Sequence, residues 1–284
     1  MRSPYGRNWR HGYFGLVLGW LARRFAAHGY HVIVQDVRGR FDSGGIFEPY
    51  LNEREDGLAL LAWLRDQAWF NGVVGMWGSS YLGMVQWAIA DAPEIKALMP
   101  MITSARLVEI VFPDGVLDLS LLLYWMAILD TGGKRRTQSL LTGGLMLAEV
   151  ELLARRAMQS QHPIESADHY SPLFAGMFRE WITQAHPDSA LWKRLQSAVP
   201  MRDVSAPVHL IGGWYDFFLR GMLRDYADLV AAGKSPRLTI GGWGHFSHLF
   251  LMLNSPPLAL AWFDAHLKHI TPPPDDPPVK LFVM

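Results

Sequence analysis

The stretch Val73-Val74-Gly75-Met76-Trp77-Gly78-Ser79-Ser80-Tyr81-Leu82-Gly83 decides the fold of this chain. An apolar run ends in glycine, two serines follow, and an amphipathic stretch then runs from Tyr81 towards Asp91. This order predicts a strand, a sharp turn and a helix, with a serine at the turn whose hydroxyl projects off the sheet. A serine in that position is typical of the nucleophile of a serine hydrolase.

The motif by itself is a weak indicator of catalysis. The strict pattern is G-x-S-x-G, and this chain has Leu82 where the last glycine would stand. Ser80 is the preferred nucleophile, because Gly78 then lies two residues before it, where a side chain would clash in the turn. Ser79 is the alternative nucleophile. The rest of the chain must supply a base and an acid.

Composition excludes several classes of protein. The 284 residues can bury a large core in one domain, or in one domain plus an insertion. The 26 basic and 26 acidic residues balance, so nothing predicts a nucleic-acid partner. The absence of cysteine excludes disulfides, thiolate metal sites and a cysteine nucleophile.

Two apolar stretches could be mistaken for targeting or membrane segments. Residues 13–22 follow a basic start, but Arg23 and Arg24 come directly afterwards and no small-x-small cleavage site closes the run. Residues 116–129 are too few to span a bilayer and include Asp118. We therefore expect two buried helices, no transmembrane segment and no membrane partner, which favours a cytoplasmic location.

Strand and helix signals alternate along the chain. Continuous apolar strands that alternate with helices indicate a mostly parallel sheet with helices on both faces, so the predicted class is α/β. The expected strands are residues 31–35, 72–77, 95–101, 208–211 and 237–240, and the expected helices are residues 53–67, 81–91, 217–232 and 258–268.

Residues 104–202 interrupt this alternation and are predicted to be mostly helical. Helices are expected at residues 104–111, 117–129, 144–158, 172–185 and 189–195. Such an insertion is best interpreted as a cap over the carboxyl ends of the strands, where ligands bind. The predicted organisation is thus a core made of residues 1–103 and 203–270, the helical cap at 104–202, and a proline-rich linker that begins the segment 271–284.

Aromatic residues of the predicted cap suggest an apolar pocket. Packing inside the cap is their preferred role, and substrate contact is the alternative. They are Trp125, Phe174, Phe178, Trp181 and Trp192.

An acid and a histidine each follow a predicted strand. Asp216 comes after Gly212-Gly213-Trp214-Tyr215, and His245 comes after Gly241-Gly242-Trp243-Gly244. A serine hydroxyl needs a base, and the base needs a group that orients it. The chain order Ser80, Asp216, His245 is the order of an α/β-hydrolase.

Other roles for these residues remain open. Asp216 could cap the helix expected to begin near Phe217. His245 could be an ordinary loop histidine, with His248 as the rival base three residues later.

An acyl-transfer site also needs donors for an oxyanion. One donor should be the backbone N–H of Tyr81, the residue after the nucleophile. The second should come from the loop at residues 2–6, just before the first helix.

At this point the residues resemble a family. The chain is similar to the CocE/NonD hydrolases, which include cocaine esterase and the α-amino-acid ester hydrolases and belong with the Xaa-Pro dipeptidyl-peptidase (S15) group. The resemblance covers nearly the whole chain and is weakest at residues 104–202. Its motifs are residues 3–6, 29–40, 47–50, 53–57, 71–83 and 213–216.

The resemblance implies an α/β-hydrolase fold with a helical cap and no cofactor or metal. Carried over, Ser80 is the nucleophile, Asp216 the orienting acid and His245 the base. The hydroxyl of Tyr5 and the N–H of Tyr81 form the oxyanion hole.

The implied function is a serine esterase or acylase that cleaves a small-molecule ester or amide, such as an α-amino acyl substrate, through an acyl-enzyme. An Xaa-Pro dipeptidyl-peptidase is the alternative, and it would need an acidic pair in the pocket to hold the substrate ammonium. Asp36, Arg38 and Asp56 are expected to form structural ion pairs.

The chain departs from the family at both ends. Members begin with further strands before Ser3-Pro4-Tyr5-Gly6 and continue into a β-sandwich, so both parts are expected to be absent here. Residues 279–284 are expected to be the first strand of that sandwich. A sheet edge would then be unpaired, which favours association. A catalytically silent, truncated fragment is therefore a further alternative.

Overall fold

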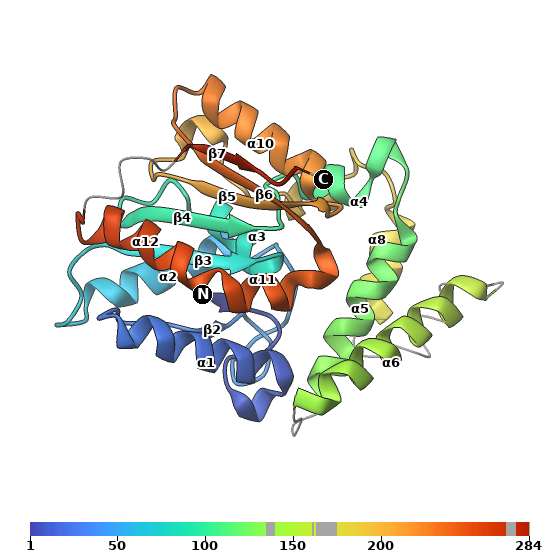
Figure 1. The fold of residues 1–284 in the computed structure, drawn as a ribbon. Coiled ribbons are helices and arrows are strands. Elements are labelled where there is room, and N and C mark those ends of the chain that lie inside the picture. The colour runs from blue at the N-terminus through green and yellow to red at the C-terminus, as the bar shows by residue number, and fades with distance from the viewer. Residues whose placement is uncertain (135–139, 161, 163–174, 271–276, 284) are drawn as a thin grey trace.

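A five-stranded parallel sheet forms the centre of the computed structural model, which describes residues 1–134, 140–160, 162, 175–270 and 277–283 (Figure 1). The neighbouring strands all run parallel. In spatial order they are β3 (Val74–Ser79), β4 (Ile95–Met101), β5 (His209–Tyr215), β6 (Arg237–Gly244) and β7 (Val279–Leu281).

Helices cover both faces of this sheet, as the sequence predicts for an α/β protein. Successive strand residues point to opposite faces, so Met76 and Trp77 belong to different hydrophobic clusters. One face packs on α1 (Tyr13–Ala27), α11 (His248–Asn254) and α12 (Pro256–Leu267); the other packs on α2 (Glu53–Arg65), α3 (Tyr81–Trp87) and α10 (Leu219–Ala231).

The strand predicted at residues 31–35 is mostly absent. Only β2 (Gln35–Asp36) forms, and it pairs in parallel with β1 (Arg2–Ser3). Val32 and Ile33 instead line a cavity of about 390 Å³ beside β3. Among the described residues no strand pairs with them, so an extended run of β-branched residues remains without a ladder.

Residues 104–202, called the insertion from here on, form a layer of helices beside the sheet (Figure 1). The described helices overlap the predicted ones. They are α4 (Leu107–Val111), α5 (Leu119–Lys134), α6 (Leu140–Gln159), α8 (Ala175–Thr183) and α9 (Ala190–Leu195), with a short 3₁₀ turn, η2 (Pro113–Gly115). Helix α4 begins three residues later than predicted, and α5 and α6 are longer than predicted. Phe174 lies outside the described residues.

The chain leaves and re-enters the core at neighbouring strands. Met101 at the end of β4 pairs with Ile211 of β5, and the Ile102 N–H donates to the Ile211 carbonyl at 2.6 Å.

The described residues also form the 3₁₀ turns η1 (Trp9–His11), η3 (Met201–Asp203) and η4 (His245–Ser247). None of the described helices is both long and apolar enough to cross a bilayer.

The last strand lies where the sequence does not place it. β7 pairs with β6 through Leu238 and Val279, and the Trp214 indole donates to the Phe282 carbonyl at 2.7 Å. The segment that resembles the start of a further domain is thus an edge strand of the core sheet.

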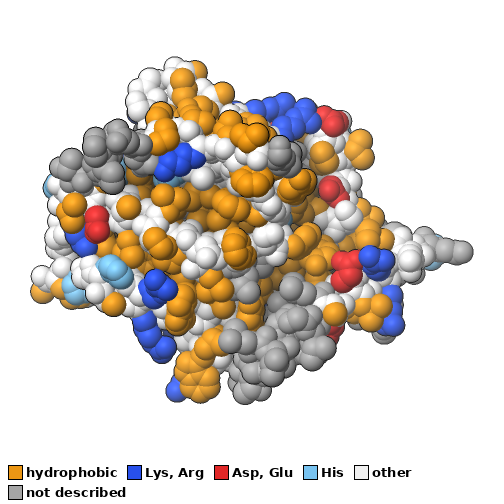
Figure 2. Space-filling model, in the orientation of Figure 1, with side chains coloured by type: hydrophobic (Ala, Val, Ile, Leu, Met, Phe, Trp, Pro, Cys, Tyr) orange, Lys and Arg blue, Asp and Glu red, His pale blue; other side chains and the backbone are white. Residues whose placement is uncertain are grey.

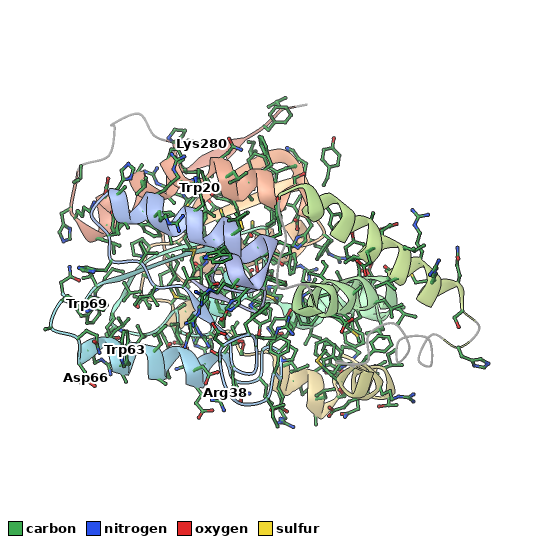
Figure 3. All side chains as sticks on the ribbon, turned by 90° about the horizontal axis from the view of Figure 1, so that it is seen from below. Trp20, Arg38, Trp63, Asp66, Trp69 and Lys280 are labelled. Carbon is green, nitrogen blue, oxygen red and sulfur yellow. The ribbon has the colours of Figure 1, made fainter. Side chains whose placement is uncertain are left out.

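At the far end of α2 from the insertion, Trp63 and Trp69 meet edge to face at 6.3 Å (Figure 3).

Candidate active site

Ser80 lies in a strained turn between β3 and α3. Its backbone angles are φ 54° and ψ −122°, a combination that non-glycine residues avoid. The Ser80 N–H donates to the Met101 carbonyl at 2.9 Å, which fixes the turn to the end of β4. Strained serines held this way between a strand and a helix expose their hydroxyl above the sheet.

Two glycines explain the spacing of the serine motif. A Cβ on Gly78 would lie 2.4 Å from the Cβ of Leu82, and the φ of Gly78 is 154°. A Cβ on Gly83 would lie 2.3 Å from Cγ2 of Thr103, just beyond β4. The first glycine therefore makes room for Leu82 in the turn, and the second lets α3 pack closely on the chain that follows β4.

β5 and β6 are longer than the sequence predicts, because their glycine segments continue as strands. A Cβ on Gly213 would lie 2.0 Å from the Trp243 carbonyl oxygen, and one on Gly244 would lie 2.7 Å from the Tyr215 oxygen. The glycines therefore permit close packing of the two strands. As a result Asp216 and His245 each follow directly on a strand, at adjacent strand ends.

Ser80, His245 and Asp216 form a hydrogen-bonded chain. His245 Nε2 lies 3.1 Å from Ser80 Oγ, and Nδ1 lies 2.9 Å from Asp216 Oδ2. The Asp216 side chain is fully buried, and its Oδ1 also accepts the Phe218 N–H at 2.7 Å. An aspartate at Nδ1 favours the tautomer that leaves Nε2 free to accept the serine proton.

The structure brings Ser80 to the histidine, while Ser79 is the buried last residue of β3. Asp216 also accepts the Phe218 N–H just before α10. It therefore stabilises the turn that leads into this helix as well as contacting the histidine. His248 is the first residue of α11, and its side chain lies outside the described part of the structure.

The Tyr5 hydroxyl reaches the same point from the loop after β1. It lies beside Ser80, and it accepts the Trp125 indole N–H at 3.1 Å. Burial raises the pKa of Tyr5 to about 12, and the bond from Trp125 offsets part of that rise. The phenol is therefore protonated at neutral pH and can donate a hydrogen bond.

The backbone N–H of Tyr81 is at the first position of α3, where helix N–H groups lack an intrahelical acceptor. Below it, the Tyr81 hydroxyl donates to Glu53 and accepts the Tyr50 N–H at 3.2 Å. Glu53 in turn pairs with buried Arg2 at 2.9 Å. Burial raises the pKa of Glu53, and Arg2 lowers it in part. The sequence pattern gives no sign of this support beneath the turn.

A cavity of about 420 Å³ opens between the serine turn and the insertion. Its lining is mostly apolar and includes Trp125 and Trp181. Phe217 and Phe218 flank the His245 ring at 4.4 and 5.3 Å between centroids. The insertion thus contributes both to the cavity wall and to its own core, because two further aromatics, Phe178 and Trp192, are fully buried.

The remaining charged motif residues form ion pairs away from Ser80. Arg38 Nε lies 3.1 Å from Asp56, which is in the first turn of α2. Asp36 lies close to His11 and Asp42, a group that could in principle hold a metal ion. The Arg7 guanidinium contacts both of those carboxylates, at 3.4 and 3.0 Å, so we assign no metal there.

Comparisons with known proteins show which family the chain resembles. The family model for X-Pro dipeptidyl-peptidase (S15 family) matches residues 1–247. Cocaine esterase from Rhodococcus sp. is 29% identical over 310 aligned residues, which cover 100% of this chain and 52% of the esterase. The chain therefore spans about half the length of that curated relative.

Solved structures show the same fold. Two crystal structures of a CocE/NonD family hydrolase from Staphylococcus aureus align with TM-scores of 0.59 and 0.57. Their sequence identities are 20% and 21%, and each alignment covers 87% of this chain and 39% of the other.

Proposed function

The chain belongs to the X-Pro dipeptidyl-peptidase (S15) family of hydrolases, and we propose that it cleaves esters or amides through an acyl-enzyme formed on Ser80. The observation that carries the proposal is the hydrogen-bonded chain from Ser80 through His245 to Asp216, at 3.1 and 2.9 Å. A hydroxyl, an acceptor nitrogen and a buried carboxylate in this order are the parts of nucleophilic catalysis by serine.

In the acylation step, His245 Nε2 takes the Ser80 proton while Oγ attacks the substrate carbonyl carbon. Buried Asp216 stabilises the imidazolium that forms. The developing oxyanion accepts hydrogen bonds from the Tyr5 hydroxyl and the Tyr81 N–H. His245 then donates its proton to the leaving alcohol or amine as the bond to the acyl carbon breaks.

Deacylation repeats these roles with water. His245 removes a proton from a water molecule, which attacks the acyl carbon, and the tetrahedral intermediate collapses to release the acid. Ser80 Oγ recovers the proton from His245. This proposed reaction cycle uses no cofactor, and each proton passes between His245 and Ser80, water or the leaving group.

The cavity favours an apolar acyl group. Its volume of about 420 Å³ and its lining by Trp125, Phe217 and Phe246 suit an aromatic or branched acyl ester. The likeness to an esterase named for cocaine supports the same class of substrate.

Dipeptidyl-peptidase activity is the second candidate, favoured by the family model. It requires a carboxylate that can pair with a substrate ammonium. Two carboxylates, Asp118 and Glu151, line the cavity. Asp118 already accepts the Leu121 N–H at 2.9 Å and Glu151 pairs with Arg155 at 2.5 Å, which favours an ester over an Xaa-Pro peptide.

The test compares p-nitrophenyl ester hydrolysis by the wild type and by Ser80→Ala. Removal of the nucleophile should lower kcat by about 10⁴-fold or more, because general acid–base catalysis then has no group to activate. An Xaa-Pro-anilide measured alongside distinguishes the esterase from the peptidase. Equal ester hydrolysis by the two proteins would rule out Ser80 as the nucleophile.

Labelling with a fluorophosphonate separates an active site from a silent fragment. A preformed serine–histidine pair should react with the probe in the wild type and not in Ser80→Ala. A folded wild type that neither labels nor turns over ester would support the silent alternative.

A further inference from the structure

A residue of the insertion donates a hydrogen bond to the proposed oxyanion hole. Trp125, on α5, places its indole N–H 3.1 Å from the Tyr5 hydroxyl oxygen. The same tyrosine lies beside Ser80, and both line the cavity of the candidate site. The tryptophan therefore contacts the group that is expected to hold the oxyanion, and it does so from outside the core sheet.

The chemistry of the two side chains fixes the direction of these bonds. An indole N–H can only donate, whereas a phenol has one hydrogen to give and lone pairs to accept. Because Trp125 donates to the Tyr5 oxygen, the single Tyr5 hydrogen is left to point into the cavity that Tyr5 and Ser80 share. A donor to the phenol oxygen also strengthens the hydrogen bond that the phenol itself donates.

The orientation of the indole is fixed by aromatic packing. Trp125 stacks on Tyr50 at 5.6 Å and on Trp181 at 5.9 Å, with interplanar angles of 22° and 11°. It also lies nearly parallel to Tyr81, whose hydroxyl is held by Glu53. The N–H direction is thus set by neighbours that do not depend on substrate.

A buried arginine joins the two backbones that carry this hydrogen bond. Arg40 Nε donates to the Pro4 carbonyl at 2.9 Å, next to Tyr5. A second guanidinium nitrogen donates to the Leu129 carbonyl at 2.9 Å, one helical turn after Trp125. Arg40 is only 7% exposed, so both hydrogen bonds lie in the interior. Together they hold the loop that carries Tyr5 at a fixed distance from α5.

We propose that Trp125 is a positioning residue of the oxyanion hole, which aims the Tyr5 hydrogen at the oxyanion and makes helix α5 part of the catalytic apparatus. The inference rests on the proposed serine mechanism and adds to it a requirement that the core alone does not meet. Loss of the indole N–H should slow the chemical step even in substrates that do not touch α5.

The test is a double-mutant cycle of Trp125→Phe and Tyr5→Phe, measured with a small acyl ester. In the Tyr5 background, Trp125→Phe should lower kcat about tenfold and change KM by less than about threefold. In the Tyr5→Phe background, the same substitution should have almost no effect on kcat, because no hydroxyl remains to be positioned. Equal losses in the two backgrounds would overturn the proposal.

The matched control is Trp192→Phe, at another buried tryptophan of the insertion. Among the described residues its indole N–H has no hydrogen-bond partner, so removal of that N–H should leave kcat within about twofold. Trp125→His retains a ring N–H and should recover part of the activity that Trp125→Phe loses. A folded His variant no faster than the Phe variant also counts against the proposal.

Ser80→Ala in the same assay distinguishes this inference from the function on which it rests. Activity that survives in Ser80→Ala overturns the serine mechanism and the role of Trp125 together. Activity that depends on Ser80, with no coupling between Trp125 and Tyr5, overturns the role of Trp125 alone.

Discussion

Gly78 and Leu82 show how single residues determine the serine turn. Their Cβ positions would be 2.4 Å apart if Gly78 had a side chain, so glycine at one position permits leucine at the other. Leu82 is 3% exposed and packs with the cluster on the α1 side of the sheet. Leu82 thus stands where the last glycine of G-x-S-x-G would be, and its side chain packs in the core beneath the turn.

Gly78→Ala should destabilise the fold and abolish turnover. The added methyl meets backbone-proximal atoms and also requires a φ of 154°, so we expect the free energy of unfolding to fall by about 2–4 kcal/mol. Urea denaturation measures the change. Gly19→Ala is the matched control: it lies inside α1 with open space around it, and should raise the free energy of unfolding by up to about 1 kcal/mol.

The proximity of three polar residues could be predicted, because each follows a strand that the sequence indicates clearly. Ser80, Asp216 and His245 come after short apolar runs that end in glycine. Arg40, Glu53 and Trp125 leave no such marks, since their partners are backbone carbonyls, a tyrosine hydroxyl and the Tyr5 phenol, all distant in the chain. Only three-dimensional contact shows them.

At the scale of elements, Asp225 fastens α10 to the start of the insertion. Its Oδ2 accepts the Ser104 hydroxyl at 2.7 Å and the Ala105 N–H at 2.9 Å. Arg106 Nε lies 3.3 Å from Oδ1. A Cβ on Gly221 of α10 would lie 2.6 Å from Ser104 Oγ, so the helix approaches this joint closely.

Stability should depend on pH through Asp225. Burial raises its pKa from 3.8 to about 6, and the bond from Ser104 offsets part of the rise. The folded state therefore binds a proton more tightly than the unfolded state, and the contribution of Asp225 to stability falls as pH rises from about 4 to 6.

Asp225→Asn removes this titration. The unfolding free energy of the wild type, minus that of the variant, should fall by about 2–3 kcal/mol between pH 4 and pH 6 and stay constant above. Urea denaturation across that range measures the difference. A difference that is flat, or that rises with pH, contradicts the expected shift.

The helices of the insertion could be predicted from their own periodicity, because apolar spacing is a local property. Strand boundaries were harder. The apolar run at residues 31–35 has strand composition, yet a strand needs a neighbour, and only Gln35 and Asp36 have one. Conversely, Gly212 and Gly213 have poor strand propensity but pair with Ile240 and Gly241 of β6.

At the scale of the whole molecule, one face of the surface carries many apolar side chains. Figure 2 shows hydrophobic side chains spread over the face that carries α1, α11 and α12. Trp20 on α1 is 40% exposed and Phe250 on α11 is 61% exposed. The edge strand β7 is partly exposed as well, so its attachment to β6 depends mainly on the ladder and on Phe282.

Removal of residues 277–284 should weaken the whole fold. β6, which leads to His245, would lose the bonds from Phe282 to Ile240 and from Leu238 to Pro278. We expect the melting temperature to fall by about 5 °C and ester turnover to fall with it. Removal of residues 283–284 alone is the control and should change the melting temperature by no more than about 1 °C, because Val283 is 85% exposed.

The sequence predicts that the strands before and after the insertion share one sheet, but it does not predict the place of β7. His245 and Ser80 meet across 165 positions, and the alternating pattern suffices to place both at the same sheet edge. Residues 279–281 resemble the start of another domain in sequence, and nothing in so short a run indicates which sheet it joins.

The insertion leaves the core after Met101 and returns beside it at Ile211, on neighbouring strands. The insertion could therefore be exchanged. Another helical segment whose ends are one strand spacing apart could be grafted between β4 and β5 without a change in sheet register. Such a chimera would need new partners for Asp225 and Arg40, and full turnover would require the graft to bring its own N–H to Tyr5. Substrate range and rate would then be engineered in the same exchangeable segment.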